Sequence, residues 1–326
     1  MVQRTFDYVG TNPLRLGISS CLIGEKVRFN GGHVRDAILE DTLGRYVDWV
    51  PICPEVEIGM GIPRETIRLT GHQNEPQLIA PKSQTNHTTN MKQWTQSYLK
   101  QLSTSNLDGY VLKKDSPSCG LFRVRIYDTD TTYSRNGTGL FARELTTTFP
   151  LLPVEEEGRL HDPKLRENFI ERLFAYSEWR QLTTDNPTIP NLIAFHTAHK
   201  STLMAHQPRN QTALGRIVAQ VKPQTLQATL EEYSSLFMET MTFIATTKKH
   251  TNVLQHLIGF LKTYLPSEDK FELLDLIEQY RNKQIPLIVP VTLLQHHLRK
   301  YSVPDWVKTQ TYLNPYPREL SLRNHV

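Results

Sequence analysis

The spacing of hydrophobic residues changes near residue 160, and this change constrains the fold more than any other feature of the sequence. Before it, segments with strand-like spacing alternate with segments of helical spacing. We expect strands at 14–20, 47–52, 107–112 and 122–127, and helices at 33–45, 89–102 and 139–149. This alternation is typical of crossover units in a largely parallel sheet. It predicts an α/β domain with a Rossmann-like, mostly parallel sheet over residues 1–159.

The second half shows helical spacing with few strand signals. Helices are expected at 163–182, 191–206, 224–246 and 267–283. The acidic run Glu155-Glu156-Glu157, followed by Gly158 and Pro163, has the character of a domain junction. We therefore expect an all-α domain over residues 160–326.

Composition excludes several classes of protein. The chain has 326 residues, of which 38% are hydrophobic and 21% charged, as in a soluble globular protein. No apolar run approaches the roughly 20 residues that span a bilayer, so no membrane partner is expected. The first residues have no apolar signal region, and three cysteines make no disulfide scaffold. A cytoplasmic protein with reduced thiols is the expectation.

The positions of the three cysteines relative to the predicted strands are informative. Cys21 and Cys53 directly follow the first and second strands, and Cys119 comes seven residues after the third. The carboxyl ends of parallel strands share one edge of a sheet, so the three thiols can converge there. Free cysteines are, alternatively, often small buried hydrophobes. If they converge, they suit zinc with a fourth ligand, or an iron–sulfur cubane with one iron open to substrate.

Three separated motifs resemble the thiouracil desulfidase family over about residues 12–150. They are CLIGEKVRFNGG at 21–32, CPE at 53–55 running on to GIPR at 61–64, and SPSCG at 116–120. Phe29-Asn30 stands where the family more often has Tyr-Asp. Residues 160–326 resemble the helical YbgA-type domain, most clearly in FHTAHKSTLMAH at 195–206. The combination is similar to bacterial desulfidases that remove sulfur from 4-thiouridine in transfer RNA.

The resemblance implies a [4Fe-4S] cluster bound by Cys21, Cys53 and Cys119, with the fourth iron open to substrate. A thiocarbonyl sulfur is a soft donor, which suits thiolate-bound iron as a Lewis acid. The implied reaction is hydrolytic conversion of 4-thiouridine to uridine with release of sulfide. Glu55, two residues from Cys53, is the expected general acid or base. Its alternative role is to cap its own loop.

Other residues of the motifs are candidates for contacts with the substrate. Ser116 is expected to hydrogen-bond the substrate or water, although a hydroxyl that closes a turn is the competing interpretation. Arg28 and Arg64 can neutralise a phosphate or the charge of the cluster, or be ordinary surface arginines. The predicted substrate-binding set is Arg28, Asn30, Arg64 and Ser118.

The helical domain carries the whole net charge of +4. His196 and His199 share a helix face with Lys200, but no carboxylate accompanies the histidines at ligand spacing, which favours histidines satisfied within the fold over a metal site. A basic face for the phosphates of transfer RNA is the function that fits the resemblance. The candidate RNA-binding residues are His196, His199, Lys200, Arg209, Arg216, Lys248 and Lys249.

Two other functions are compatible with the sequence. The same chemistry can act on free thiouracil or another small thio-base, with the helical domain serving stability or assembly. Alternatively, the chain is a non-enzymatic protein with a structural zinc that binds nucleic acid or a partner. Metal analysis separates the last alternative from the first two. About four irons with matching sulfide per chain indicate a desulfidase, and one zinc indicates the non-enzymatic protein.

Overall fold

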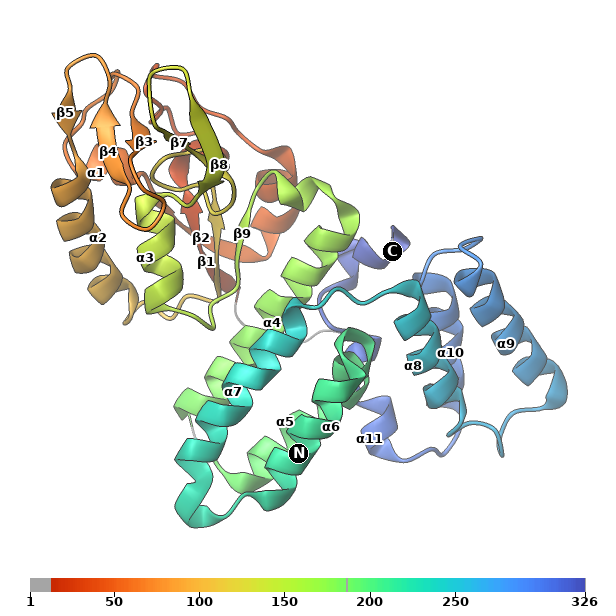
Figure 1. The fold of residues 1–326 in the computed structure, drawn as a ribbon. Coiled ribbons are helices and arrows are strands. Elements are labelled where there is room, and N and C mark those ends of the chain that lie inside the picture. Colours follow the sequence, from red (N-terminus) through yellow and green to blue (C-terminus); the bar gives the residue numbers. More distant parts are fainter. Residues whose placement is uncertain (1–12, 186, 326) are drawn as a thin grey trace. The chain divides into compact units, whose positions relative to one another are not determined.

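The computed structural model describes residues 13–185 and 187–325. The chain divides into two compact units, residues 12–161 and the region after residue 161 (Figure 1). The first combines strands with helices, and the second is helical, as the hydrophobic pattern predicts.

The first unit contains a four-stranded sheet in which every pairing is parallel. Its order is β2-β1-β6-β9. The strands are β1 (Leu14–Ser19), β2 (Val47–Ile52), β6 (Gly109–Leu112) and β9 (Val154–Glu156). Since all four run the same way, their carboxyl ends lie along one edge, where ligands bind in open α/β sheets. Three of these strands coincide with sequence predictions, whereas β9 lies in the acidic run that suggested a junction.

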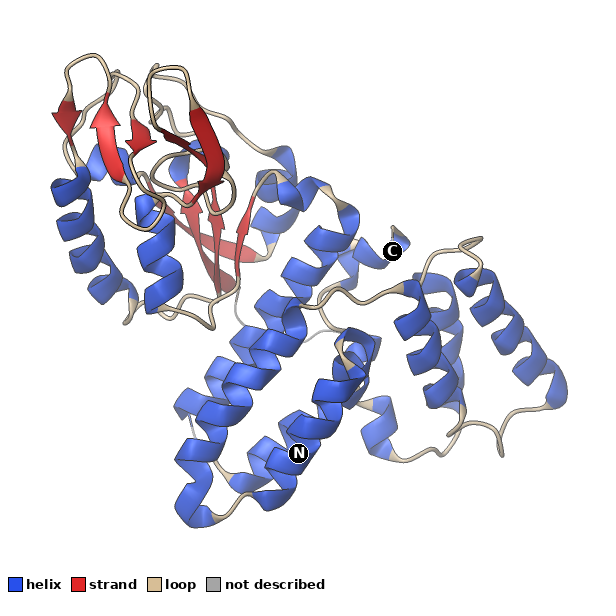
Figure 2. Ribbon diagram, in the orientation of Figure 1, coloured by secondary structure: helices blue, strands red, loops and turns tan. Residues whose placement is uncertain are grey.

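A second, five-stranded sheet in this unit was not expected from the sequence. Its order is β5-β4-β3-β7-β8, with β3 and β7 parallel and the other pairs antiparallel. The strands are β3 (Arg68–Thr70), β4 (Gln77–Ala80), β5 (Thr85–Asn86), β7 (Val124–Tyr127) and β8 (Tyr133–Gly137). Helices α2 (Thr88–Leu102) and α3 (Leu140–Thr148) lie next to the strands of this unit (Figure 2). Met91 of α2 and Leu140 of α3 belong to the buried apolar cluster of this sheet. Most of the strands are short, which explains why sequence spacing detects only β7.

The segment expected as a helix at 33–45 instead forms irregular turns. A π-helical turn covers Ile38–Thr42 and a 3₁₀ turn covers Leu43–Arg45. The carboxylate of Asp36 accepts the N–H groups of Ile38 and Leu39, at 3.0 and 3.2 Å. These are the hydrogen bonds of a helix N-cap, so the helical turns begin only after Asp36 and are shorter than the spacing predicts. Helix α1 (Pro54–Glu57) begins immediately after Cys53, with proline at its first position.

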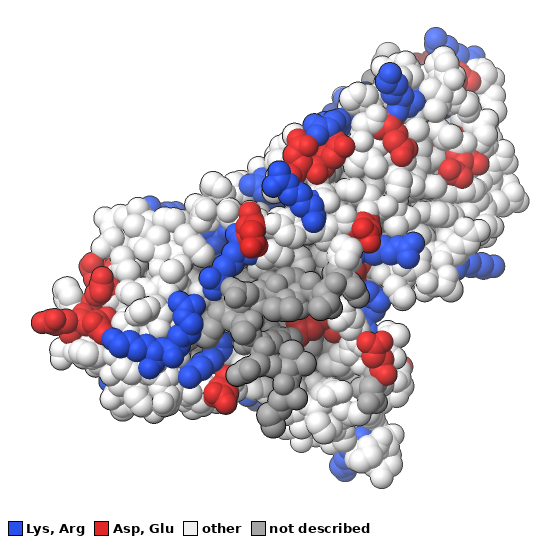
Figure 3. Space-filling model, turned by 180° about the vertical axis from the view of Figure 1, so that it is seen from behind, with Lys and Arg blue, Asp and Glu red and all other residues white. Residues whose placement is uncertain are grey.

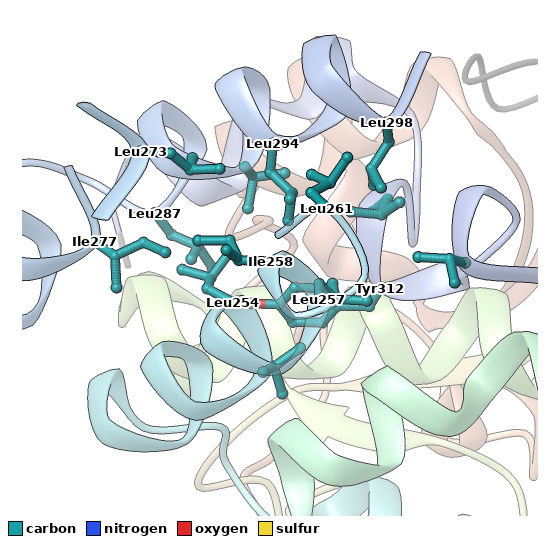
Figure 4. Close-up of a cluster of buried hydrophobic side chains, with 14 of the residues drawn as sticks. Leu254, Leu257, Ile258, Leu261, Leu273, Ile277, Leu287, Leu294, Leu298 and Tyr312 are labelled. Atoms are coloured by element: carbon teal, nitrogen blue, oxygen red, sulfur yellow. The ribbon is translucent and has the colours of Figure 1, made fainter. Parts of the chain in front are cut away.

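In the described part of the second unit, helices cover the four stretches named from the sequence and further segments of the predicted all-α domain. Those expected are α4 (Pro163–Asp185), α5 (Ile189–His206), α7 (Leu226–Thr242) and α9 (Ser267–Arg281). The others are α6 (Pro208–Gln220), α8 (Thr247–Ile258), α10 (Ile288–Lys300) and the short α11 (Asp305–Lys308). Leucines from α8, α9 and α10 meet Tyr312 in a buried apolar cluster (Figure 4). Among the described residues, no helix is both long and apolar enough to span a bilayer.

Candidate active site

A cavity of about 550 Å³ lies at the carboxyl edge of the parallel sheet, and all three cysteines line it. Cys21 follows β1, Cys53 follows β2, and Cys119 lies in the loop after β6. Cys21 and Cys119 are buried, and Cys53 is partly exposed. The strands thus bring together three thiols that are separated by 32 and 66 residues in the sequence.

Burial favours the protonated form of the three thiols. It is the main cause that raises the pKa of Cys21 to about 12, with a smaller contribution from Cys53. Burial likewise raises the pKa values of Cys53 and Cys119. Such thiols hold their protons until a metal displaces them, so metal binding at this site releases protons.

The distances between possible metal ligands differ for a single zinc ion and for an iron–sulfur cluster. Within residues 13–185 and 187–325, no three His, Cys, Asp or Glu side chains gather closely enough for one metal ion. A structural zinc draws its ligands to roughly 2.0–2.3 Å from a single centre. A cubane cluster is larger than one ion and is held by thiolates that stand further apart. The donor set around the cavity is three thiols from three loops, and thiolates are the ligands that hold iron–sulfur clusters.

Glu55 is held between two side chains at the cavity. Its Oε1 accepts a hydrogen bond from the hydroxyl of Ser118 at 2.7 Å. Its Oε2 accepts from Nε and Nη2 of Arg64, at 3.1 and 2.5 Å. The side chain of Arg64 is only 4% exposed, and its Nη1 donates to the carbonyls of Val27 and Gly61. Arg64 is thus a buried partner of Glu55 rather than a surface arginine.

The two serines of the Cys119 loop have different roles. The Oγ of Ser116 accepts the N–H groups of Ser118 and Cys119, at 3.3 and 3.1 Å, which closes the turn. The hydroxyls of Ser116 and Ser118 are 3.0 Å apart. A continuous chain of hydrogen bonds therefore runs from Ser116 through Ser118 and Glu55 to Arg64. In this chain Ser118, not Ser116, contacts the carboxylate.

Basic side chains outnumber acidic ones around the cavity. Arg28 lines it, with its guanidinium 5.4 Å from the ring centre of Phe29. Asn30 is exposed and is not among the lining residues; its Oδ1 accepts the N–H of Gly32. Sequence reasoning missed three basic residues of the lining: Lys113, Lys114 and Arg125. The first two directly follow β6, a position that could have indicated them.

The histidines predicted to bind RNA are buried in the helical unit. His196 is 4% exposed and its Nδ1 lies 3.1 Å from the hydroxyl of Tyr233; burial lowers its pKa to about 4. His199 is fully buried, and its Nδ1 lies 3.0 Å from the carbonyl of Phe195. Neither ring reaches a surface where a phosphate binds. The expectation that His196 and His199 contact RNA is therefore corrected by their burial.

The basic residues of the same set lie nearer the solvent. Arg209, Arg216 and Lys248 are exposed. Lys200 is partly exposed, with its Nζ 5.9 Å from the ring centre of Trp306. Lys249 is partly exposed, and its Nζ donates to the carbonyl of His206. On the face shown in Figure 3, basic and acidic side chains are interspersed.

Comparison with known proteins gives family matches in both halves of the chain. Residues 16–157 match the family model of 2-thiouracil desulfurase, and residues 200–317 match a family of unknown function, DUF1722. The uncharacterized protein YbgA of Escherichia coli (strain K12) is 30% identical over 160 residues, which are 48% of this chain and 94% of YbgA. A solved structure, the [4Fe-4S]-dependent thiouracil desulfidase TudS, is 24% identical. The alignment covers 46% of this chain and 94% of that one, with a TM-score of 0.38.

Proposed function

Since this chain belongs to the family of YbgA and also carries a 2-thiouracil desulfurase domain, we propose that it is a [4Fe-4S]-dependent desulfidase acting on 4-thiouridine in transfer RNA. The overall reaction is hydrolysis: the thiocarbonyl and one water give the carbonyl of uridine and hydrogen sulfide. The observation that carries the proposal is the convergence of Cys21, Cys53 and Cys119 on one cavity beside the Glu55 carboxylate.

The cysteines hold the cofactor in this proposal, and Glu55 moves the proton. When bound to the three thiolates, the cluster supplies a soft Lewis acid for the thiocarbonyl sulfur. Glu55 Oε1 takes a proton from the water that attacks C4 of the base and returns it to the departing sulfur or the ring. Arg64 keeps the carboxylate in place through its two hydrogen bonds to Oε2.

Ser118 orients Glu55 and faces the cavity. Its hydroxyl donates to Oε1, the same oxygen that handles the proton, so it fixes the direction from which this oxygen meets water. The basic side chains of the lining, including Arg28 and Lys113, balance the negative charge of three thiolates.

The exposed basic residues of the helical unit are the proposed contacts to the RNA backbone. Arg209, Arg216 and Lys248 carry positive charge into solvent, where phosphates bind without base recognition. The thio-base itself has to leave its stack to enter the cavity, as other nucleobase-modifying enzymes require.

Anaerobic purification followed by iron and sulfide analysis tests the cofactor. We expect about four irons and four sulfides per chain in the wild-type protein, and a large loss of both in Cys119→Ser. One zinc per chain, with no labile sulfide, would contradict the proposal.

Activity on two substrates tests the substrate class. The loaded protein is given intact transfer RNA containing 4-thiouridine and, separately, free 4-thiouracil, and the loss of thio-base absorbance is followed. We expect faster turnover of the RNA. Turnover of the free base alone would instead assign the enzyme to small thio-bases.

A further inference from the structure

The acidic run at the end of β9 is buried, contrary to its appearance in the sequence. Glu155, Glu156 and Glu157 are only 5%, 6% and 6% exposed. Strand β9 pairs in parallel with β6, with Leu112 opposite Glu156, so the run ends at the sheet edge that carries the cysteines. Carboxylates are almost never buried without partners, so each of these three side chains is expected to bind a positively charged or N–H group.

Glu156 binds the chain just after Cys119. Its Oε1 accepts the N–H groups of Leu121 and Phe122, at 2.8 and 3.0 Å. Burial raises the pKa of Glu156, and these two N–H groups oppose that rise. One carboxylate oxygen thus fixes the end of the loop that carries Cys119.

Glu157 binds the beginning of the same loop. Its Oε2 accepts the N–H of Lys114 at 2.7 Å, and its Oε1 lies 2.5 Å from Nζ of Lys113. The side chains of Lys113 and Glu157 are 18% and 8% exposed. Lys113 also lines the cavity that the three cysteines share.

Between these two anchors the loop is tightly packed. The N–H of Gly120 donates to the carbonyl of Ser116 at 2.8 Å, and a Cβ at Gly120 would lie 2.7 Å from that oxygen. A Cβ at Gly139 would lie 2.4 Å from the carbonyl oxygen of Ser118. The backbone around Cys119 is therefore closely packed, so a displacement of either anchored end also displaces Cys119.

We propose that Glu156 and Glu157 are positioning residues, which hold the two ends of loop 113–122 so that Cys119 and Lys113 face the cluster site. The role in holding a cluster ligand rests on the proposed function. The hydrogen bonds of Glu156 and Glu157 to the loop are present without a cluster. Glu156 is the last residue of β9 and Glu157 follows it in the chain, and the two neighbouring carboxylates bind the two ends of one loop.

Hydrogen exchange and site-specific alkylation of the metal-free full chain test the anchors. In Glu156→Ala we expect the amides of Leu121 and Phe122 to exchange on the order of tenfold faster, and Cys119 to alkylate faster relative to Cys53. In Glu157→Ala we expect faster exchange at Lys114, with the amides of Leu121 and Phe122 less affected. Unchanged exchange and alkylation in both variants would overturn the inference.

Conservative and neighbouring variants separate positioning from general stability. Glu156→Gln keeps an acceptor oxygen, so we expect it to restore slow exchange at Leu121 and Phe122. Glu155→Ala is the matched control, because Glu155 is equally buried but bonds Arg159 and the N–H of Glu156 instead of the loop. Equal loosening of the loop in Glu155→Ala would contradict the assignment.

Iron retention connects the anchors to the cluster. After anaerobic loading, we expect Glu156→Ala to lose iron to a chelator several-fold faster than wild type, with Glu156→Gln close to wild type. Equal retention in wild type and Glu156→Ala would overturn the link to the cluster. A wild-type protein that binds no iron would refute the proposed function. The hydrogen-exchange experiment uses the metal-free chain, so it would still test whether Glu156 and Glu157 anchor the loop.

Discussion

The carboxylate of Glu55 and the guanidinium of Arg64 form a nearly buried ion pair beside Cys53, joined by two hydrogen bonds to a single carboxylate oxygen. The Nη2 of Arg64 also lies 3.8 Å from the sulfur of Cys53. One arginine thus contacts both the proposed proton carrier and a proposed cluster ligand. The other carboxylate oxygen of Glu55 is held by Ser118 alone among the hydrogen bonds between described residues.

Glu55→Gln tests the proton-transfer role. The amide preserves the size of the side chain but cannot take up a proton, so we expect turnover to fall by about 10²–10⁴-fold. The visible absorption of the cluster should remain, because the cysteines are unchanged. Steady-state rates and absorption spectra of the loaded protein check both expectations.

Glu57→Gln is the control for this variant. Glu57 lies on the same helix, α1, but is exposed and does not line the cavity. We expect wild-type turnover. Unchanged turnover in Glu55→Gln would remove Glu55 from the mechanism.

Substitutions of the two serines should have different effects. Ser118→Ala removes the hydrogen bond to Glu55, so we expect slower turnover with normal iron content. Ser116→Ala removes the acceptor for the N–H of Cys119, at a cost of about 1 kcal/mol, so we expect weaker iron retention. Iron content and rate, measured on the same samples, distinguish the two. Identical profiles for both variants would contradict this division of roles.

Much of the site could be predicted because parallel strands impose order on distant residues. Strands β1, β2 and β6 have clear apolar runs, so the positions of Cys21, Cys53 and Cys119 after them follow from the sequence. The position of the strands does not show which serine binds Glu55 and which closes the turn. Ser116 and Ser118 are both hydroxyls in one turn, and only coordinates show which one reaches Glu55.

Other features were hidden because side-chain contacts override sequence patterns. Strand β9 carries acidic residues that normally face solvent, and Lys113 together with backbone N–H groups allows their burial. The segment 33–45 has helical spacing, but its helical turns begin only after Asp36, which caps them, and continue in π and 3₁₀ geometry. His196 and His199 have the spacing of an exposed basic face, yet aromatic residues bury them.

Buried histidines should make the helical unit sensitive to acid. Burial lowers the pKa of His196 to about 4 and that of His250 to about 3, while unfolded histidine titrates near 6.5. Below pH 6.5 each of these two histidines therefore binds its proton more readily in the unfolded chain, and its own contribution to stability falls as the pH falls. The pKa of His206 is raised beside Glu171, so its contribution has the opposite sign. Between pH 7.5 and 5.5 His196 and His250 should each contribute a loss of about 1.4 kcal/mol.

Urea unfolding of the full chain, followed by hydrogen exchange in α5 at both pH values, measures this loss. His196→Gln can retain a hydrogen bond to Tyr233 but does not titrate, so its pH dependence should be smaller than that of wild type. The exposed His256 lies outside the buried network, and His256→Gln should leave the pH dependence unchanged. Identical slopes in His196→Gln and wild type would exclude His196 as a source of acid sensitivity.

Binding of transfer RNA should depend on salt through the exposed basic residues. Each phosphate contact adds roughly 1 to the slope of log affinity against log salt concentration. We expect the combined variant Arg209→Gln, Arg216→Gln and Lys248→Gln to bind more weakly and with a shallower slope, lower by up to about 3.

The matched control is Lys262→Gln, Lys270→Gln and Arg281→Gln, which removes the same charge from other exposed positions of the helical unit. Filter binding between 50 and 200 mM salt, the range over which such contacts have a large effect, measures both slopes. An equal decrease in the two variants would mean that net charge, rather than a surface formed by Arg209, Arg216 and Lys248, attracts the RNA.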